Sequence, residues 1–142
     1  MRVFDVNVLV LAHRTDRPGH DAAAAFVEAA TAGERPFTLP PVVGSGVVRV
    51  STHPRIFAEP TPLPAVLEFL DALRGRAAHV QLDEAAVWPV FTRVCRESDA
   101  RGNRVPDAYL AALAIANGAA LVSADRGLAR YEGLTVERPP GL

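Results

Sequence analysis

Near its N-terminus the chain reads Arg2–Val3–Phe4–Asp5, a short apolar run that ends in a carboxylate. Such a run predicts a buried strand, and a charge placed directly after it loses water and needs a partner. A second apolar run, Ala119–Ser123, leads to Asp125 and predicts another buried strand. Ligands of an open parallel sheet bind beyond the carboxyl ends of its strands, where strand order reverses. If these two strands are neighbours, Asp5 and Asp125 face one crevice.

The segments between these strands alternate between helical and extended patterns. Helices are expected at Val6–His13, His20–Ala32, Ala65–Gly75, Glu84 to about Ser98 (capped by Asp83), and Pro106–Asn117. Extended segments are expected at Pro36–Pro41, Val42–Ser51, His79–Leu82 and Leu134–Val136. The β-branched residues of Val42–Ser51 favour a strand, although a buried helix produces the same short apolar run. Strands that alternate with longer helices predict a mostly parallel α/β sheet in a single domain, residues 1–142.

Composition excludes several kinds of chemistry. All 15 basic residues are arginine, which removes the P-loop and Schiff-base mechanisms because both need lysine. It also counts against response-regulator receivers and haloacid-dehalogenase-like phosphatases. The single cysteine, Cys95, excludes an intramolecular disulfide and a cysteine-based zinc cluster. No signal peptide or membrane span is recognisable, so a cytoplasmic protein is expected. At a net charge of −1, nucleic-acid binding requires a local basic patch.

A third acidic residue, Asp107, lies in the first turn of the predicted Pro106–Asn117 helix. Taken alone, an aspartate at this position is most often a cap, and one that follows a strand often begins a turn. Three clustered carboxylates, however, repel one another and favour a bound cation. Oxygen ligands favour Mg²⁺ or Mn²⁺ over zinc, and these ions activate water beside a phosphodiester. Phosphodiester hydrolysis is therefore the chemistry that fits.

Three motifs in this order resemble those of PIN-domain nucleases. Phe4–Asp5–Val6–Asn7–Val8–Leu9 resembles the N-terminal D-x-N signature of the family. Val105–Ala112 resembles the family's helix-start aspartate, and Leu121–Asp125 resembles its strand-end aspartate. The resemblance extends over essentially the whole chain and implies a PIN-like three-layer α/β/α fold. The length suits VapC toxins, the PIN ribonucleases of bacterial toxin–antitoxin pairs.

The resemblance implies a Mg²⁺- or Mn²⁺-dependent endoribonuclease toxin. Such a toxin is usually a homodimer and is held inactive by a small VapB-type antitoxin. Asp5, Asp107 and Asp125 would be its catalytic and metal-binding residues, while Asn7 and Ser123 match polar positions that help to orient the site. Water would attack an RNA phosphodiester while the metal stabilises the developing charge.

The sequence also departs from the family pattern. Family members commonly supply a glutamate from the segment that corresponds to Val42–Val50, where this chain has Gly44–Gly46. Gly127 and Leu128 stand where a second acid often follows Asp125. The number of metals therefore stays open. Two alternatives remain: a degenerate PIN-like domain that binds RNA or a protein without cleaving, and a different small α/β metallohydrolase such as a phosphatase.

Several other residues allow two interpretations each. Arginines that form either a phosphate-binding patch or a solvated, ion-paired face are Arg93, Arg96, Arg101, Arg104, Arg126 and Arg130. Asp99 is a further carboxylate in a polar loop, where a solvated role is the simpler assignment. The apolar faces of Gly19–Ala32 and Ala65–Leu73 suit either the core or a surface for a dimer partner or an antitoxin helix.

Overall fold

A four-stranded parallel sheet runs through the middle of the computed structural model, which describes residues 1–142. The strands are β1 (Arg2–Phe4), β2 (Phe37–Thr38), β3 (Ala120–Val122) and β4 (Thr135–Glu137). They lie in the order β2-β1-β3-β4 and every pair is parallel. The chain passes from β1 to β2 on one side and later enters β3 on the other side. Strand order therefore reverses between β1 and β3, the two strands predicted to lead to Asp5 and Asp125.

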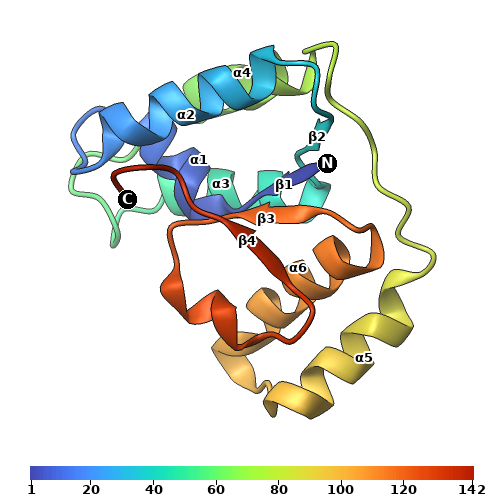
Figure 1. Cartoon of the computed structure of the whole chain (residues 1–142). Coiled ribbons are helices and arrows are strands. Elements are labelled where there is room, and N and C mark those ends of the chain that lie inside the picture. The colour runs from blue at the N-terminus through green and yellow to red at the C-terminus, as the bar shows by residue number, and fades with distance from the viewer.

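Helices cover both faces of this sheet (Figure 1). On one side lie α1 (Val6–His13), α2 (His20–Ala32), α3 (Pro41–Ser51) and α4 (Leu63–Arg74). On the other lie α5 (Val87–Ser98) and α6 (Val105–Ala116), and short 3₁₀ turns occupy Gly102–Arg104 and Arg126–Arg130. The predicted three-layer α/β/α arrangement is confirmed. None of the helices is long and apolar enough to span a membrane.

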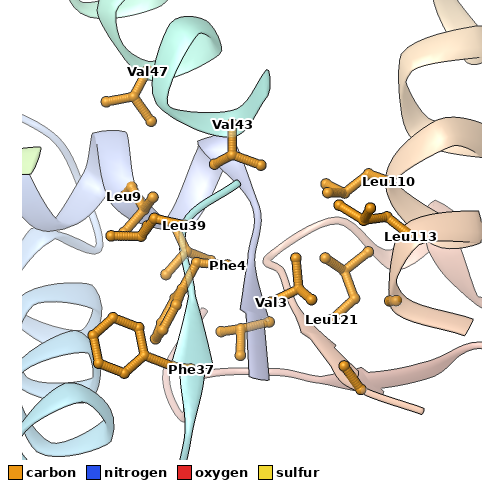
Figure 2. Close-up of a cluster of buried hydrophobic side chains, with 14 of the residues drawn as sticks. Val3, Phe4, Leu9, Phe37, Leu39, Val43, Val47, Leu110, Leu113 and Leu121 are labelled. Atoms are coloured by element: carbon orange, nitrogen blue, oxygen red, sulfur yellow. The ribbon is translucent and has the colours of Figure 1, made fainter. Parts of the chain in front are cut away.

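Buried side chains fill the space between the sheet and both helix layers. Figure 2 shows Leu9 of α1 on one side of β1 and Leu110 and Leu113 of α6 on the other. The rings of Phe4 and Phe37, on neighbouring strands, meet edge to face with their centroids 5.8 Å apart. This packing fixes the ends of β1 and β3 relative to the start of α6.

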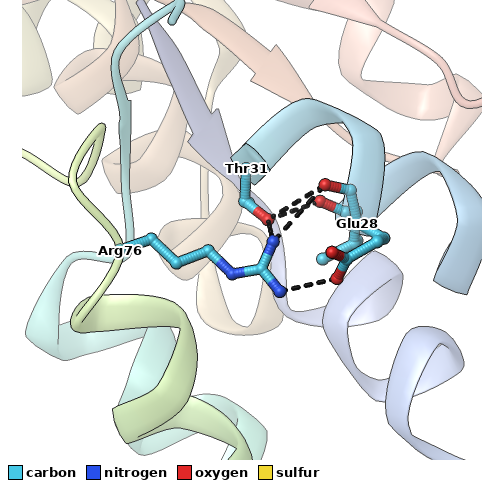
Figure 3. Close-up of polar contacts among 4 residues, drawn as sticks. Glu28, Thr31 and Arg76 are labelled. Atoms are coloured by element: carbon cyan, nitrogen blue, oxygen red, sulfur yellow. Dashed lines mark hydrogen bonds and ion pairs between the residues drawn. The ribbon is translucent and has the colours of Figure 1, made fainter. Parts of the chain in front are cut away.

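A polar contact joins α2 to the end of α4 (Figure 3). Arg76 donates from Nη1 to the hydroxyl of Thr31 at 2.8 Å and from Nη2 to the carboxylate of Glu28 at 2.6 Å. The guanidinium group therefore holds the chain after α4 against the last turns of α2.

The predicted strand at Val42–Ser51 is wrong, because this segment forms helix α3. Its buried residues are Val43, Val47 and Ser51, which recur every four positions and so lie on one helical face. Pro41 is the first helical residue, where the missing N–H and the fixed φ of proline cost nothing. Packing against α1 therefore outweighs the β propensity of the valines.

Two further predictions are corrected. His79–Leu82 forms no strand, because its pairing with the edge strand is limited to one bridge between Phe37 and His79. The helix expected from Glu84 begins at Val87 instead, and Asp83 accepts a hydrogen bond from the N–H of Ala85 in the preceding turn. Pro89 explains the later start, since proline is tolerated in the first turn of a helix but not in its interior.

Candidate active site

Asp5 lies between the end of β1 and the start of α1, and its two carboxylate oxygens have different partners. Oδ1 accepts a hydrogen bond from the N–H of Val6 at 2.6 Å. Oδ2 accepts one from Asn7 Nδ2 at 2.8 Å and one from Ser123 Oγ at 2.6 Å. The carboxylate is thus held in one orientation at the point where strand order reverses.

Asn7 and Ser123 also connect the ends of β1 and β3 to each other. Ser123 is fully buried, and its hydroxyl accepts hydrogen bonds from Asn7 Nδ2 and from the N–H of Asp125, both at 3.0 Å. Asn7 Oδ1 accepts one from the N–H of Ala124 at 3.2 Å. With its proton donated to Asp5, the serine hydroxyl uses its full capacity of one donor and two acceptors. Ser123 is therefore the centre of this network.

Asp125 begins the 3₁₀ turn that follows β3. Its Oδ1 accepts a hydrogen bond from the N–H of Gly127 at 2.7 Å, and the side chain is otherwise exposed. A side chain at position 127 would collide with the guanidinium group of Arg130, which donates to the carbonyl of Gly127. A side chain at this position would thus displace the end of the flexible Arg130 side chain.

Asp107 lies in the first turn of α6, half-buried, and its carboxylate receives no hydrogen bond from the protein. Burial raises the pKa of Asp107, the negative charge of Asp125 raises it further, and Arg130 opposes the shift. Burial also raises the pKa of Asp5, against the hydrogen bonds from Ser123 and Val6, and the charges of Asp107 and Asp125 add to the increase. All three carboxylates line one hollow of the surface, so their charges repel one another.

These carboxylates border a groove that consists of two adjoining hollows, of about 500 Å³ and about 440 Å³. Both hollows are lined by Asp5, Val6 and Asp107. The first, here called the helix hollow, is also lined by Ser45, Gly46, Arg49, Asn103 and Tyr109. The second, here called the loop hollow, is also lined by Asn7, Leu11, Arg17, Ile56, Phe57 and Asp125. Asp5 and Asp107 thus form the middle of the groove.

The donor chemistry of the groove fits a hard divalent cation. No three His, Cys, Asp or Glu side chains converge as ready-made ligands of one ion. Mg²⁺ needs no such set, because it usually keeps several waters and binds through one or two carboxylates. Asp5 and Asp107 offer oxygen atoms only, they repel each other, and Asp107 lacks a protein partner. A cation between them would relieve this repulsion.

Helix α3 brings no acidic residue to the groove, because it has Gly44–Gly46 in the segment where family members commonly have a glutamate. It contributes Ser45, Gly46 and Arg49 instead. A Cβ at position 46 would lie 2.7 Å from Cγ2 of Val6, so glycine allows α3 to approach the start of α1 closely. This segment without a glutamate therefore packs against α1 beside the groove.

Two of the arginines considered as a phosphate-binding patch form ion pairs on the surface, and two other arginines line the groove. Arg93 pairs with Glu97 and Arg101 pairs with Asp99 on exposed surfaces, so for these two the solvated interpretation holds. Sequence reasoning missed Arg17 and Arg49, which line the groove. The spacing Ser45–Arg49 would have indicated Arg49 had the segment been recognised as a helix. Arg17 lies in a loop, and no periodic pattern predicts its position.

A parallel sheet between two helix layers, with acidic side chains where strand order reverses, defines an α/β domain of nuclease type. Comparison with known proteins agrees, because the family model of the PIN domain matches residues 2–134. The chain is 36% identical over 141 residues to Ribonuclease VapC25 of Mycobacterium tuberculosis, covering 99% of both proteins. It is 39% identical over 140 residues to Ribonuclease VapC43 of the same organism, covering 98% of this chain and 95% of that one.

A solved structure shares the fold. It is the crystal structure of VapBC2 from Rickettsia felis bound to a DNA fragment from the VapBC2 promoter. The two chains align with a TM-score of 0.71 over 96% of this chain and 97% of that one, at 18% sequence identity. The chain belongs to the PIN-domain family and, within it, to the VapC group.

Proposed function

We propose that the protein is a metal-dependent endoribonuclease toxin that hydrolyses RNA phosphodiester bonds and is neutralised by a VapB-type antitoxin. The observation that carries this proposal is that the Asp5 carboxylate, which hydrogen bonds from Asn7 and Ser123 hold in place, lines the same open groove as Asp107. The Asp107 carboxylate accepts no hydrogen bond from the protein. The curated relatives are named ribonucleases, and they match the chain over nearly its full length. Asp5, Asp107 and Asp125 are the proposed catalytic and metal-binding residues.

Each side chain has a distinct proposed task. Asp5 and Asp107 would hold Mg²⁺ or Mn²⁺ in the middle of the groove, with Asp125 beside them. When bound, the ion would supply an activated water and neutralise charge on the phosphodiester oxygen. Asn7 and Ser123 keep the Asp5 carboxylate oriented through their hydrogen bonds to Oδ2. Because that geometry is set before substrate enters, little reorganisation is needed during the reaction.

The test is cleavage of labelled structured RNAs, including tRNAs, with Mn²⁺, with Mg²⁺ or with EDTA. Asp5→Asn and Asp107→Asn are compared with the wild type, and Asp99→Asn serves as a control that removes a carboxylate from an exposed loop. Discrete cleavage that requires metal, persists in Asp99→Asn and disappears in both site variants is the expected result. Cleavage that persists in the site variants would contradict the assignment of the site.

A degenerate domain that binds RNA or a protein without cleaving is the second candidate function. It is favoured by the acid-free α3 and by the lack of a converging three-ligand set. Titration calorimetry with Mn²⁺ separates the two candidates. Binding that is lost in Asp107→Asn supports the nuclease, whereas no binding by the wild type, together with no cleavage, supports the degenerate domain.

The proposed partners are an antitoxin and a second copy of this chain. Exposed apolar side chains on α4, Leu63 and Leu67, provide a surface of the kind that an antitoxin helix or a partner subunit could cover. Light scattering of the purified protein is expected to give the mass of a homodimer. Co-expression with a VapB-type antitoxin is expected to yield a complex that does not cleave RNA.

A further inference from the structure

A separate pocket of about 250 Å³ lies where strand β2 leads into helix α3. It shares no lining residue with either hollow of the groove. Its walls come from the end of β2, the start of α3, the last residue of α4 and the connection that follows α4. The polar residues of this pocket, here called the β2 pocket, are Thr38, Arg74, His79, Gln81 and Glu84.

Arg74 brings a positive charge to the β2 pocket. It is the last residue of α4, and its Nη1 donates to the carbonyl of Leu39 at 2.6 Å. The ion pairs of the protein involve other arginines, so no carboxylate neutralises Arg74. A guanidinium group has five N–H donors. The bond to Leu39 therefore restrains the group and leaves its other donors available to a ligand.

His79 adds a neutral donor. Its Nε2 accepts a hydrogen bond from the N–H of Leu39 at 3.3 Å. Burial lowers the pKa of His79, and the charge of Arg74 lowers it further, so the ring is neutral at pH 7. A neutral imidazole that accepts at Nε2 carries its proton on Nδ1. This Nδ1–H has no acceptor in the protein and is available to a ligand in the pocket.

The Thr38 hydroxyl lacks a partner although its side chain is almost completely buried. Thr38 ends β2, is 1% exposed and lines the pocket. No hydrogen bond joins its hydroxyl to the protein, whereas the other buried threonine, Thr31, donates to the carbonyl of Val27. The only fully enclosed side-chain atoms without a partner belong to His13 and Ser51, so the Thr38 hydroxyl reaches the pocket surface. Because buried hydroxyl groups are normally paired, a ligand in the pocket would supply the missing partner.

The charges around the β2 pocket favour an anion. Helix α3 begins in its wall at Pro41 without a side-chain cap, and the N-terminal end of a helix attracts negative charge. Glu84 is the one acidic residue of the pocket, and its side chain is exposed to solvent. A guanidinium group, an imidazole N–H and a hydroxyl together suit an anion with several acceptor oxygens, as phosphate has.

We propose that the β2 pocket binds a phosphate group, with Arg74, His79 Nδ1 and Thr38 Oγ1 as donors to its oxygens. The proposal is independent of the nuclease function, because the pocket contains none of the residues of that site. A phosphate bound here would join the end of β2, the end of α4 and the start of α3. Free phosphate and a phosphate monoester both present this group.

Binding is measured by titrating the protein with inorganic phosphate or with glycerol 3-phosphate, in EDTA and at constant ionic strength. Amide NMR signals report the affinity, and saturable shifts at Thr38 and Leu39 are expected to locate the site. Thr38→Val, which exchanges the hydroxyl for a methyl group, is expected to weaken binding about threefold to tenfold. Arg74→Gln is expected to weaken it about tenfold or more, because it removes the charge.

Two further variants test the role of charge. Glu84→Gln removes the opposing charge of an exposed carboxylate and is expected to tighten binding about twofold. Arg96→Gln is the matched control for Arg74→Gln, because Arg96 is exposed on α5, outside the β2 pocket, and its loss is expected to leave the affinity unchanged.

Each outcome decides for or against the site. Binding that weakens in Thr38→Val and Arg74→Gln but not in Arg96→Gln supports it. Within that result, affinity for inorganic phosphate alone identifies the free ion as the ligand, and affinity for glycerol 3-phosphate identifies a monoester. If Arg74→Gln fails to fold because Leu39 loses its donor, Thr38→Val decides. No binding of either compound, or wild-type affinity in Thr38→Val, overturns the proposal.

Discussion

Asp107 carries its charge at a cost to the stability of the fold. The pKa of Asp107 is raised by burial and by Asp125, so the folded state favours the neutral form of the group and its charge at neutral pH is destabilising. We expect Asp107→Asn to raise the Tm by about 2–4 °C, roughly 1 kcal/mol for a chain of this size, while abolishing cleavage. Thermal melts in EDTA measure the effect.

Asp5→Asn is the natural comparison for this prediction. Asp5 accepts hydrogen bonds on both oxygens, and an amide would place an NH₂ group against one of these donors. The relief of repulsion is therefore offset by a lost hydrogen bond, and no increase in Tm is expected. A Tm of Asp107→Asn at or below that of the wild type would contradict this account of the charge.

Ser123 is expected to matter for activity without touching the substrate. Ser123→Ala removes the donor to Asp5 Oδ2. It also removes the acceptor of two part-buried donors, Asn7 Nδ2, which keeps its bond to Asp5, and the N–H of Asp125. Supporting hydrogen bonds of this kind are typically worth about 10–100-fold in metal affinity or activity. We expect a reduction of this size in both cleavage rate and Mn²⁺ affinity. A variant that loses folding stability but retains the Mn²⁺ affinity of the wild type would show that Ser123 contributes to stability and does not orient Asp5.

The acidic residues of the site could be predicted from the sequence, whereas its basic residues could not. Asp5 and Asp125 each follow a buried strand, and strand ends are placed by topology, so local pattern is enough. Arg17 enters the groove because the loop after α1 folds over Phe57. That contact joins segments about 40 positions apart in the chain, and neither segment has a periodic signal of its own.

Among the elements, α3 contains two glycines with opposite surroundings. A Cβ at Gly44 would have no neighbour within 4 Å, whereas one at Gly46 would lie 2.7 Å from Val6 Cγ2. We expect Gly44→Ala to stabilise the protein by about 0.5–1 kcal/mol, because alanine favours the helix. We expect Gly46→Ala to destabilise it and to reduce cleavage, since Val6 is β-branched and has little rotamer freedom in α1.

Denaturant unfolding curves for both alanine variants provide the measurement. The two substitutions add the same methyl group two positions apart in one helix, so propensity contributes about equally to both. Their difference therefore reports the contact between α3 and α1. Equal stabilities for the two variants would mean that α3 can shift without cost.

Two of the errors at the scale of elements originate in tertiary contact, whereas the later start of α5 follows from Pro89. The valines of α3 favour a strand by propensity, but a buried face that repeats every four residues requires a helix. His79–Leu82 has the composition of a strand, but its neighbour β2 is only two residues long, because Pro40 already caps α3. His79–Leu82 therefore has too short a partner to pair with along its length. By contrast, α1 and α2 match their predicted bounds, because their helical spacing and burial agree.

At the scale of the whole molecule, Glu137 near the C-terminus pairs with two arginines from the first quarter of the chain. Arg2 of β1 donates to both of its carboxylate oxygens, at 2.9 and 2.8 Å, and Arg35, which precedes β2, pairs with it at 3.2 Å. These partners come from elements that the sheet brings side by side, although they are distant in the sequence. The carboxylate is only 25% exposed, so solvent screens the ion pair incompletely.

The pH dependence of the free energy of unfolding should reveal the ion pairs of Glu137 with Arg2 and Arg35. Hydrogen bonding from Arg2 lowers the pKa of Glu137 from its ordinary value of 4.5, so its stabilising effect is fully present above pH 4.5 and is lost as the pH falls through the lowered pKa. At pH 7 we expect Glu137→Gln to cost about 1 kcal/mol, or about 2–4 °C in Tm. The difference from the wild type should shrink below pH 4.5, because the wild-type carboxyl then also becomes neutral. Glu132→Gln is the matched control, because it removes the same charge from an exposed turn that no arginine pairs with. A deficit in Glu137→Gln that stays constant down to pH 3 would mean that side-chain packing, rather than charge, joins β4 to β1.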